Sequence, residues 1–591
     1  MAEPGPGANV PPAVSVETLL YLGICAVGLA VRLFQLGAWP LSASESQTAL
    51  AAWLTVQGYR PDTWGMSSLL VYGTALGFVP LAASDATARL APALVGAALV
   101  GLPWFLRDRL GRAGALAASL LLALSPSFLF FSRSLDGGIV TAAGGLGLLV
   151  CALRYVDRPR RAWLYAGAAC LTLLVMGEGS GWATIAVLGA GLAWVTLRGG
   201  RSADWLGLAA AFRSTRLLVF LAALLVLVST GLLTNLGGLQ HGLLDPLLAW
   251  LGGFLPGAAT LPWSYHLTNL LAYEPLLVVF SAVAMGLLVY DTRPRRDDEP
   301  PESGGRGFFA FLGLWTLASL IWTTVSAAKP ASTILHVALP MALLAAWVIG
   351  RLVTAMAQSR LFSSGGVALA WTYFVMLLAV AAVTNPVALF GGRFETLERQ
   401  IQVVQAVIVI ALFGGLIAMA VWLARWVGSR GAVLSLALTV LVVLGVFGIH
   451  SAWALAYFPK ETEPLAPEPA SVEMRVLAGD LAAIARLAGE SGIGITLEPG
   501  LAYPALWYLR DYRQVTLAGL TAGAQTPVVI VAKESDSGAQ PFVAGYEGRR
   551  YRLGSVWLPV MTPEANIWNW LANRVPVGPS RPLEAVMYVR N

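Results

Sequence analysis

The feature that most constrains this chain is a series of long apolar runs. Each run is long enough to cross the roughly 30 Å of hydrocarbon in a bilayer as a helix. The first is Leu19–Leu36, and twelve more follow at 90–106, 115–131, 139–153, 162–176, 182–197, 217–233, 270–290, 308–325, 334–350, 367–383, 403–423 and 433–449. Of the 591 residues, 57% are apolar and only 12% are charged, which excludes a soluble enzyme. The sequence therefore predicts a polytopic α-helical membrane domain over 17–456 with about 13 spans.

Two further segments are interpreted as something other than spans. Residues 1–16 are rich in Pro, Gly and Ala and carry no Lys or Arg, which predicts a disordered leader before an uncleaved first helix. Residues 67–83 are apolar, but a span here would place Arg107, Arg109 and Arg112 outside the membrane. We therefore expect 67–83 to form an interfacial helix in the first outer loop.

The distribution of basic residues predicts the orientation of the spans. With a cytoplasmic N-terminus, the inner loops hold 19 arginines, whereas the outer loops of the membrane domain hold six basic residues. This asymmetry is the positive-inside signal. It predicts a multi-pass protein of the cell membrane whose C-terminal part lies outside. The net charge of +6 thus comes from loops that set topology and does not indicate a nucleic-acid partner.

The composition changes after Ala456. The stretch PKETEPLAPEPAS predicts a linker over 457–467, and beyond it short apolar runs alternate with polar turns. The expected elements are helices at 472–488 and 565–575 and strands at 493–497, 527–531 and 585–589. The sequence therefore predicts an extracytoplasmic α/β domain over 468–591.

The stretch WYLRDY in this domain has more than one interpretation. Trp507 and Tyr508 suit either a saccharide-binding surface or the core, and a domain of this size needs large apolar side chains in its interior. Alternatively, WYLRDY, with Arg510 and Asp511 on the same short helix, docks this domain against the membrane domain.

Three acidic residues on the outer side are candidates for catalysis. Glu45 lies in WPLSASESQTALAAW, Asp136 in FFSRSLDGG, and Glu178 in the tight MGEGSG turn. Carboxylates are costly in or beside a bilayer, so those that occur there are often functional. All three fall on the same side of the membrane and could converge on one cavity. The alternative is that each caps a helix or faces solvent.

Basic and aromatic residues on the same side are candidates for substrate binding. Lys329 and His336 lie in SAAKPASTILHVALP, His266 and Tyr265 lie in PWSYHLTNLLAYEP, and Arg133 precedes Asp136. Lys329 is the only lysine of the membrane domain, and an ammonium can hold a phosphate as a point charge. A single histidine near a span end also commonly satisfies a backbone carbonyl. Tyr265 suits a sugar-stacking wall or an interfacial aromatic belt.

Several of these motifs together resemble a known family. The first span ends in VRLFQLG, a loop with WPL and an acidic residue follows, and ASDATAR leads into the second span. This pattern resembles the integral-membrane glycosyltransferases of the GT-C superfamily, which include protein O-mannosyltransferases and the aminoarabinose transferases of lipid A. YHLTNLLAYEPLLVV, the KP…LP stretch at 329–340 and WYLRDY are similar to the branch described as flippase-activity-associated glycosyltransferase-like.

The resemblance implies an activity and roles for the candidate residues. Such enzymes take a sugar from a polyprenyl-phosphate carrier and transfer it to a lipid, protein or glycan acceptor on the outer face. Glu45 would be the second residue of the family's Asp-Glu pair, Asp136 its second acidic motif, and Glu178 the glutamate of a Lys-Glu pair. The stretch from Lys329 to His336 would lie near the carrier phosphate. Interfacial helices in the first outer loop also fit the segment 67–83.

The chain departs from the family pattern at two positions. Ser44 stands where the catalytic aspartate is expected, and Gly177 stands where the lysine of the Lys-Glu pair is expected. A serine has no comparable basicity, so Glu45 would have to take the acceptor proton in its place. Some superfamily members also hold a divalent metal with outer-loop carboxylates. Here too few oxygen ligands remain to assign a metal site.

Three hypotheses follow for the function. The first is a glycosyltransferase that uses a polyprenyl-phosphate hexose or pentose. The second is a catalytically degenerate relative that binds lipid-linked sugar or assists its assembly or translocation, as Ser44 and Gly177 suggest. The third, a secondary transporter, is disfavoured because the spans show no two-half symmetry and no pair of broken helices in matching positions.

Overall fold

The computed structural model describes residues 15–63, 65–197, 207–208, 210–211, 213–255, 261–290, 305–359, 365–384, 411, 414–458, 463–466, 470–487, 493–519, 526–535, 545–557 and 580–590. Three of the predicted features lie wholly or mostly outside these residues. They are the leader, residues 403–410 of the run at 403–423, and the helix at 565–575.

Most of the described chain is helical and apolar. Six helices, counted with their direct continuations, are long and apolar enough to cross a membrane: α1 (Val16–Leu33), α5 to α6 (Leu90–Leu110), α9 (Gly138–Asp157), α17 (Gly305–Val325), η3 with α18 (Ala331–Gln358) and α22 (Ser429–Tyr457). Other runs form shorter helices, among them α10 (Arg161–Gly177), α11 (Gly181–Leu197), α13 (Thr215–Ser229) and α19 (Gly366–Thr384). The chain is thus a multi-pass membrane protein with fewer full-length spans in the described part than the thirteen predicted runs.

Two bent helix pairs bring the number of candidate spans in the described residues to as many as eight. Helices α7 (Arg112–Leu124) and α8 (Pro126–Ser132) meet at 56°, and α15 (Tyr265–Tyr273) and α16 (Pro275–Tyr290) meet at 101°. Each bend falls at a proline, which cannot donate the next helical hydrogen bond. The run predicted at about 270–290 thus corresponds mainly to α16, while its first turn belongs to α15.

One buried carboxyl joins the two bends. Oε1 of Glu274, the residue between α15 and α16, accepts hydrogen bonds from the Ser125 hydroxyl at 2.6 Å and the Ser127 amide at 2.8 Å. Ser127 lies in the first turn of α8, whose amides have no partner within the helix. Glu274 therefore caps α8 from a distant part of the chain.

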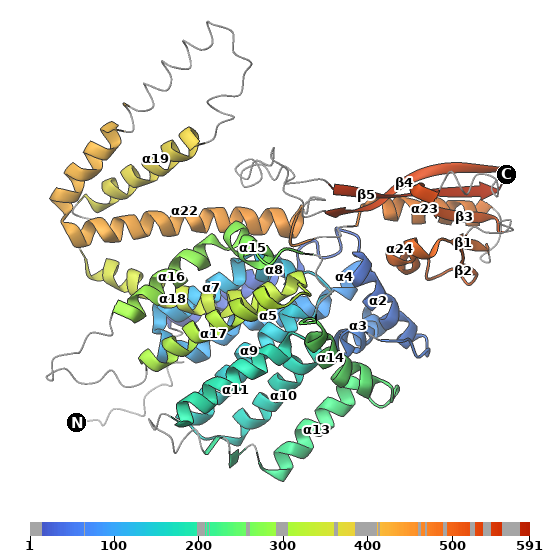
Figure 1. Ribbon diagram of the computed structural model, residues 1–591, viewed down its shortest axis with the longest axis horizontal. Coiled ribbons are helices and arrows are strands. Elements are labelled where there is room, and N and C mark those ends of the chain that lie inside the picture. The colour runs from blue at the N-terminus through green and yellow to red at the C-terminus, as the bar shows by residue number, and fades with distance from the viewer. Residues whose placement is uncertain are drawn as a thin grey trace, which may run out of the picture.

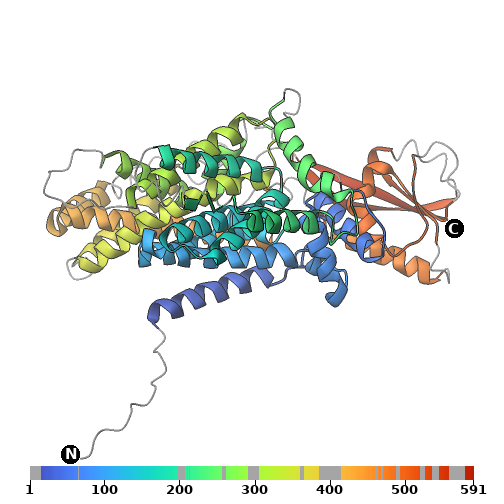
Figure 2. The ribbon, with the colours of Figure 1, turned by 90° about the horizontal axis from the view of Figure 1, so that it is seen from below.

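The core of the helical domain is formed around α18. This helix is almost entirely buried and packs against α7, α16 and α17, while α9 packs against α10 (Figures 1 and 2). Between Ile334 and Gly350 its leucine, alanine and valine side chains are enclosed on all sides, which is typical of a central helix of a bundle.

The loop between α1 and α5, predicted as the first outer loop and called by that name below, forms a small helical layer between the bundle and the C-terminal sheet (Figure 1). It contains α2 (Ala43–Val56), α3 (Ser68–Leu81) and the short α4 (Asp85–Ala88). Helix α3 coincides with the predicted interfacial helix. It packs against α2 and α5, and it leaves Leu76 and Val79 exposed on its other side.

The C-terminal part is an α/β unit, as predicted. Its elements are α23 (Glu473–Leu487), β1 (Ile495–Leu497), α24 (Ala502–Tyr508), β2 (Val515–Leu517), β3 (Val528–Ala532), β4 (Tyr546–Trp557) and β5 (Ser580–Arg590). The strand order is β2-β1-β3-β5-β4; β2, β1 and β3 run parallel, and β5 pairs antiparallel with both β3 and β4. Sequence patterns predicted α23, β1, β3 and β5 and a short helix at WYLRDY, which overlaps only the end of α24, but not β2 or β4.

The C-terminal unit docks on the first outer loop through Asp85. The Asp85 carboxylate accepts hydrogen bonds from Trp507 Nε1 at 2.7 Å, the Tyr508 hydroxyl at 3.0 Å and Arg475 Nη2 at 2.6 Å. The Tyr508 hydroxyl in turn accepts from the amide of Leu41 at 2.9 Å. WYLRDY therefore contacts the membrane domain, although Arg510 and Asp511 lie beyond the end of α24 and not on it.

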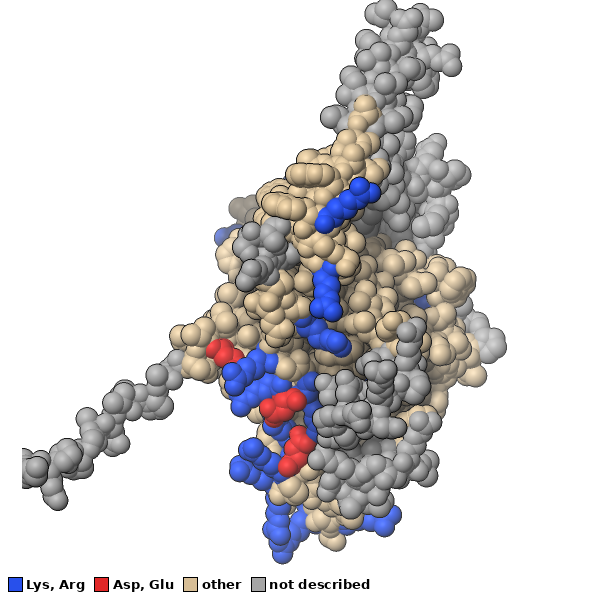
Figure 3. Space-filling model, turned by 90° about the vertical axis from the view of Figure 1, so that its left-hand side faces the viewer, with Lys and Arg blue, Asp and Glu red and all other residues tan. Residues whose placement is uncertain are grey.

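The opposite end of the molecule is rich in basic side chains (Figure 3). The turn after α5 and the end of α9 meet at ion pairs between Arg109 and Asp157 and between Arg154 and Asp108. Both segments were predicted to belong to the same set of arginine-rich loops.

Candidate active site

A cavity of about 240 Å³ lies where the first outer loop, the α8–α9 turn and the start of α18 meet. Its walls also include the end of α22 and residues of the linker to the C-terminal unit. The charged and hydroxyl side chains on its wall are Ser42, Ser44, Glu45, Arg89, Arg133, Ser134, Asp136 and Ser332. Three of the predicted site residues, Glu45, Asp136 and Arg133, therefore lie on one cavity.

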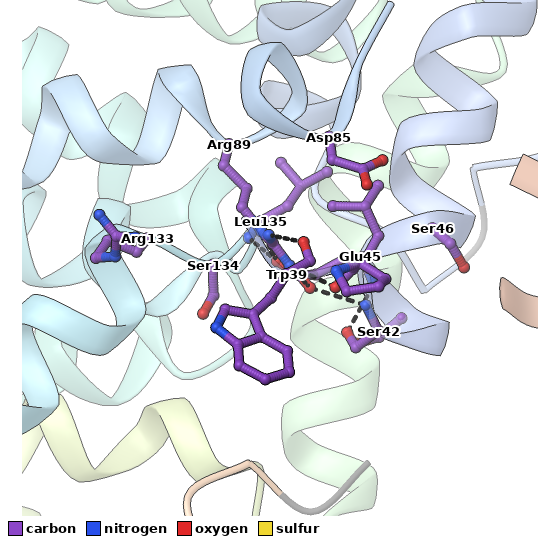
Figure 4. Close-up of polar contacts among 12 residues, drawn as sticks. Trp39, Ser42, Glu45, Ser46, Asp85, Arg89, Arg133, Ser134 and Leu135 are labelled. Carbon is purple, nitrogen blue, oxygen red and sulfur yellow. Dashed lines mark hydrogen bonds and ion pairs between the residues drawn. The ribbon is translucent and has the colours of Figure 1, made fainter. Parts of the chain in front are cut away.

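Glu45 is fixed in place by four N–H donors. It occupies the third position of α2 in a capping box, where its Oε2 accepts from the Ser42 amide at 2.9 Å. Arg89 donates to Oε1 at 2.8 Å and to Oε2 at 2.7 Å, and the Leu135 amide donates to Oε1 at 2.8 Å (Figure 4). Burial acts to raise the pKa of Glu45, but the Arg89 charge and these hydrogen bonds outweigh it and lower the pKa. A carboxylate so stabilised is a weak base.

Arg89 is a site residue that the sequence analysis did not select. Besides Glu45, its guanidinium donates to the carbonyls of Leu36, Trp39 and Pro40 at 3.4, 2.8 and 3.1 Å. All five of its N–H groups can thus be satisfied within the loop that carries Glu45. The sequence did hold a signal for Arg89, since it lies in ASDATAR and is one of the few arginines predicted to lie on the outer side.

Asp136 is less constrained than Glu45. Its Oδ1 accepts from the Gly138 amide at 2.7 Å, in the turn that leads into α9. Burial raises the pKa of Asp136, and the negative charge of Glu178 raises it further. The backbone amide of Leu135, the residue before Asp136, donates to Glu45. The ion pair between Glu45 and Arg89 therefore also fixes the backbone next to Asp136. Asp136 is therefore the carboxylate on the wall best suited to accept a proton.

Arg133 carries a positive charge that no carboxylate balances among the described residues. Its guanidinium, on a side chain 7% exposed, donates to backbone carbonyls at the end of α1, including those of Arg32 at 2.9 Å and Gln35 at 3.1 Å. It also lies over the ring of Tyr457, at 4.3 Å from the centroid. Its hydrogen bonds satisfy the donors, but its charge remains available to an anion in the cavity.

Glu178 lies next to the cavity and is connected to it by Ser332. The Ser332 hydroxyl donates to Glu178 Oε2 at 2.9 Å. On its other side, Glu178 accepts from the Ser180 hydroxyl, which lies 2.7 Å from His336 Nε2. His336 Nδ1 lies 2.7 Å from the Thr184 hydroxyl. His336 is therefore enclosed in a polar network behind the cavity and does not line it.

The other predicted substrate-binding residues do not lie on the cavity wall. Lys329 donates to the carbonyls of Thr323 and Thr324 at 2.9 Å and of Ser326 at 2.6 Å, so it caps the end of α17. His266 Nε2 lies 3.0 Å from the Thr333 hydroxyl, and the Tyr265 hydroxyl donates to the carbonyl of Pro464 at 2.6 Å. In this structure these side chains hold helix ends and the linker.

The two departures from the family pattern have different surroundings. Ser44 is exposed to the cavity, and within the described part of the chain its hydroxyl has one hydrogen-bond neighbour, the Ser42 hydroxyl at 3.3 Å. Gly177 is tightly enclosed, since a Cβ there would lie 2.6 Å from Thr141 Cγ2 and 3.1 Å from the carbonyl oxygen of Gly137. A lysine therefore does not fit at 177 without rearrangement, whereas an aspartate has space at 44.

The residues present do not fit a divalent metal. Among the described side chains, no three His, Cys, Asp or Glu residues gather as a metal-binding group. The oxygens of Glu45 already accept from four N–H groups, which leaves them poorly placed to bind a cation.

The bundle, the helical loop between α1 and α5 and the docked α/β unit together form a fold that is also seen in ArnT. No family model and no curated protein matches the sequence. The structure is similar to that of ArnT from Cupriavidus metallidurans bound to undecaprenyl phosphate, with a TM-score of 0.56 and 16% identity over 96% of this chain and 98% of that one. The apo form of ArnT gives a TM-score of 0.55 and 16% identity over 97% and 98%. An Archaeoglobus fulgidus oligosaccharyltransferase tethered to an acceptor peptide gives 0.49 and 12% over 90% and 72%.

Proposed function

We propose that this protein is a membrane glycosyltransferase that moves a sugar from a polyprenyl-phosphate carrier to an acceptor on the extracytoplasmic face. The position of Asp136 carries the proposal, because this carboxylate lies on the wall of the cavity in a turn that Glu45 holds in place. The fold supports it, since the likeness to ArnT, which was solved with undecaprenyl phosphate, extends over nearly the whole of both chains. The arginine asymmetry of the loops supports the orientation.

The proposed reaction is an inverting transfer with Asp136 as the general base. The acceptor hydroxyl gives its proton to Asp136 as its oxygen attacks the anomeric carbon. A new C–O bond forms, the bond from the anomeric carbon to the carrier phosphate oxygen breaks, and the carrier phosphate leaves with the electron pair. The charge of Arg133 stabilises the negative charge that develops on this leaving group. Glu45 acts through Leu135 and Arg89 as a positioning residue.

The direct test is transfer by an Asp136→Asn variant. Purified protein in proteoliposomes would be given undecaprenyl-phosphate hexoses and pentoses with a radiolabelled sugar, together with envelope lipids and glycans as acceptors. We expect Asp136→Asn to lower transfer by 10²-fold or more, a typical loss for a general base. Asp511→Asn, an exposed change in the C-terminal unit, is the matched control. Transfer by Asp136→Asn at the wild-type rate would contradict the mechanism.

A second candidate function is supported by Ser44. In a degenerate relative that only binds lipid-linked sugar, Ser44 marks a catalytic position that is no longer used, so restoring the aspartate there would not produce transfer. Ser44 faces the cavity, so Ser44→Asp can be made without a clash and distinguishes the two functions. Wild-type transfer favours the enzyme. Saturable binding of the carrier without transfer in either wild type or Ser44→Asp favours the binding protein.

A further inference from the structure

A second carboxylate lies directly behind Asp136. Glu178 ends α10, and it is joined to the cavity by Ser332, which is 2% exposed. The Ser332 hydroxyl donates to Glu178 and hydrogen-bonds toward Asp136 as well, so one hydroxyl stands between two acids. Asp136 before α9, Glu178 at the end of α10 and Ser332 before α18 thus lie together.

Glycines make this close approach possible. A Cβ on Gly137 would lie 2.0 Å from the carbonyl oxygen of Gly177, and a Cβ on Gly138 would lie 2.5 Å from Ser332 Cβ. A side chain at 137 would push the α8–α9 turn away from the end of α10, and one at 138 would push it away from Ser332. The backbone is therefore built so that the loop carrying Asp136 contacts both Glu178 and Ser332.

The charges around Asp136 come from four elements. Glu178 lies on one side, Glu45 of α2 on another, Arg133 precedes Asp136 in its own turn, and His336 of α18 lies behind Glu178. Arg89 neutralises Glu45, which reduces the influence of Glu45 on Asp136. Burial acts against a charge on Glu178, but hydrogen bonds from His336, Ser180 and Ser332 lower its pKa and keep it anionic.

We propose that Glu178 is a positioning residue that keeps Asp136 strongly basic, and that Ser332 couples the two carboxylates. The inference rests on the proposed function, in which Asp136 takes the acceptor proton. A negative charge held beside Asp136 favours its protonated form, as in other pairs of close carboxylates. The driving force for proton transfer from the acceptor hydroxyl is greater as a result. Glu178 itself neither gains nor loses a proton in the step.

The test is the pH profile of kcat/KM for Glu178→Gln, which removes the charge and keeps the shape. Asp136 must be ionised to act, so transfer rises with pH through its pKa. Without the neighbouring charge that pKa falls, and we expect the midpoint of the acidic limb to move down by on the order of one pH unit. The plateau rate falls as well, because the base is weaker. Ser332→Ala removes the one hydroxyl that the two carboxylates share, an interaction that lowers the pKa of Asp136, and is therefore expected to move the midpoint up.

Other outcomes overturn the inference in distinguishable ways. A lower plateau with an unmoved midpoint in Glu178→Gln would assign this residue a purely structural role and leave the glycosyltransferase function intact. If Glu178→Gln does not fold, an unmoved midpoint in Ser332→Ala has the same meaning. Wild-type protein without transferase activity would overturn the proposed function itself. In that case the pH above which the gain in thermal midpoint from Asp136→Asn becomes constant reports the folded-state pKa of Asp136, and Glu178→Gln must still lower that pH.

Discussion

Arg89 and Glu45 form a buried ion pair with two contacts, Nε to Oε1 at 2.8 Å and Nη2 to Oε2 at 2.7 Å, and both side chains are only 8% exposed. The pair joins the segment before α5 to the first turn of α2. Through the amide of Leu135 it also holds the turn that carries Asp136. A residue that suggested catalysis from its sequence position is therefore part of the frame on which the cavity is built.

The first prediction concerns this pair. Arg89→Met leaves Glu45 as an uncompensated buried carboxylate, so we expect the free energy of unfolding to fall by about 3–5 kcal/mol. The double variant Arg89→Met/Glu45→Met removes both charges and should lose less stability than Arg89→Met alone. Thermal unfolding in detergent micelles measures both. If the double variant loses as much stability as Arg89→Met and Glu45→Met lose together, the two residues are not coupled.

The role of Glu45 illustrates what the sequence could predict. The pattern from Ser42 to Glu45 is compatible with a helix cap, and capping was one of the two interpretations. The partner at Arg89 lies 44 residues away, and no local pattern indicates a contact at that distance. For the same reason Lys329 was expected at a phosphate, although its ammonium is held by carbonyls at the end of α17.

Fold-level features were more accessible to sequence reasoning. The apolar runs predicted the helices, because a segment that crosses a membrane must satisfy its own backbone hydrogen bonds and must be apolar over the thickness of the bilayer. Strands β1, β3 and β5 were predicted from buried apolar stretches such as Val528–Ala532. Strand β2 has only three residues, and β4 contains glycines and arginines, so neither shows a strand pattern. The bends at Pro126 and Pro275 depend on packing and on Glu274, which a hydropathy profile does not register.

The second prediction concerns the docking of the C-terminal unit. Asp85→Ala leaves Trp507 Nε1, the Tyr508 hydroxyl and Arg475 without their shared acceptor. Because one donor is charged and the other two are neutral and at least partly buried, the loss of their acceptor should lower the free energy of unfolding by about 2–4 kcal/mol. We expect faster amide hydrogen exchange in α24 and around Leu41, with the central helix α18 unchanged. Exchange in Asp511→Asn is the control. Equal protection of α24 in wild type and Asp85→Ala would show that Asp85 does not hold the interface.

The third prediction is a pH-dependent gain in stability from Asp136→Asn. Burial and Glu178 raise the pKa of Asp136 above its value in the unfolded chain. At pH values above the folded-state pKa, the folded protein holds an unfavourable charge, so its removal should raise the thermal midpoint. Below the unfolded-state pKa, Asp136 is neutral in both states and the gain disappears. A thermal midpoint that Asp136→Asn lowers at neutral pH would indicate that the carboxylate stabilises the fold.

The fourth prediction tests the charge of Arg133. Arg133→Gln keeps part of the hydrogen bonding to the end of α1 but removes the positive charge on the cavity wall. We expect the Kd for undecaprenyl phosphate to rise about thirtyfold or more, since loss of one partner of a buried charge pair costs at least about 2 kcal/mol. Undecaprenol, which has no phosphate, should bind both proteins equally. An unchanged Kd in a folded variant would separate Arg133 from the carrier phosphate.

The last prediction contrasts the two departures from the family pattern. Gly177→Ala places a methyl group 2.6 Å from Thr141 Cγ2 and 3.1 Å from the carbonyl oxygen of Gly137, so the α8–α9 turn must move. We expect a loss of about 1–3 kcal/mol from overpacking, and Gly177→Lys should be worse. Because that turn carries Asp136, transfer should fall together with stability. Ser44→Asp has open space in front of it and should leave the thermal midpoint nearly unchanged. If Gly177→Lys folds as well as wild type, the close contact between the two turns is not required, and the family lysine is compatible with this cavity.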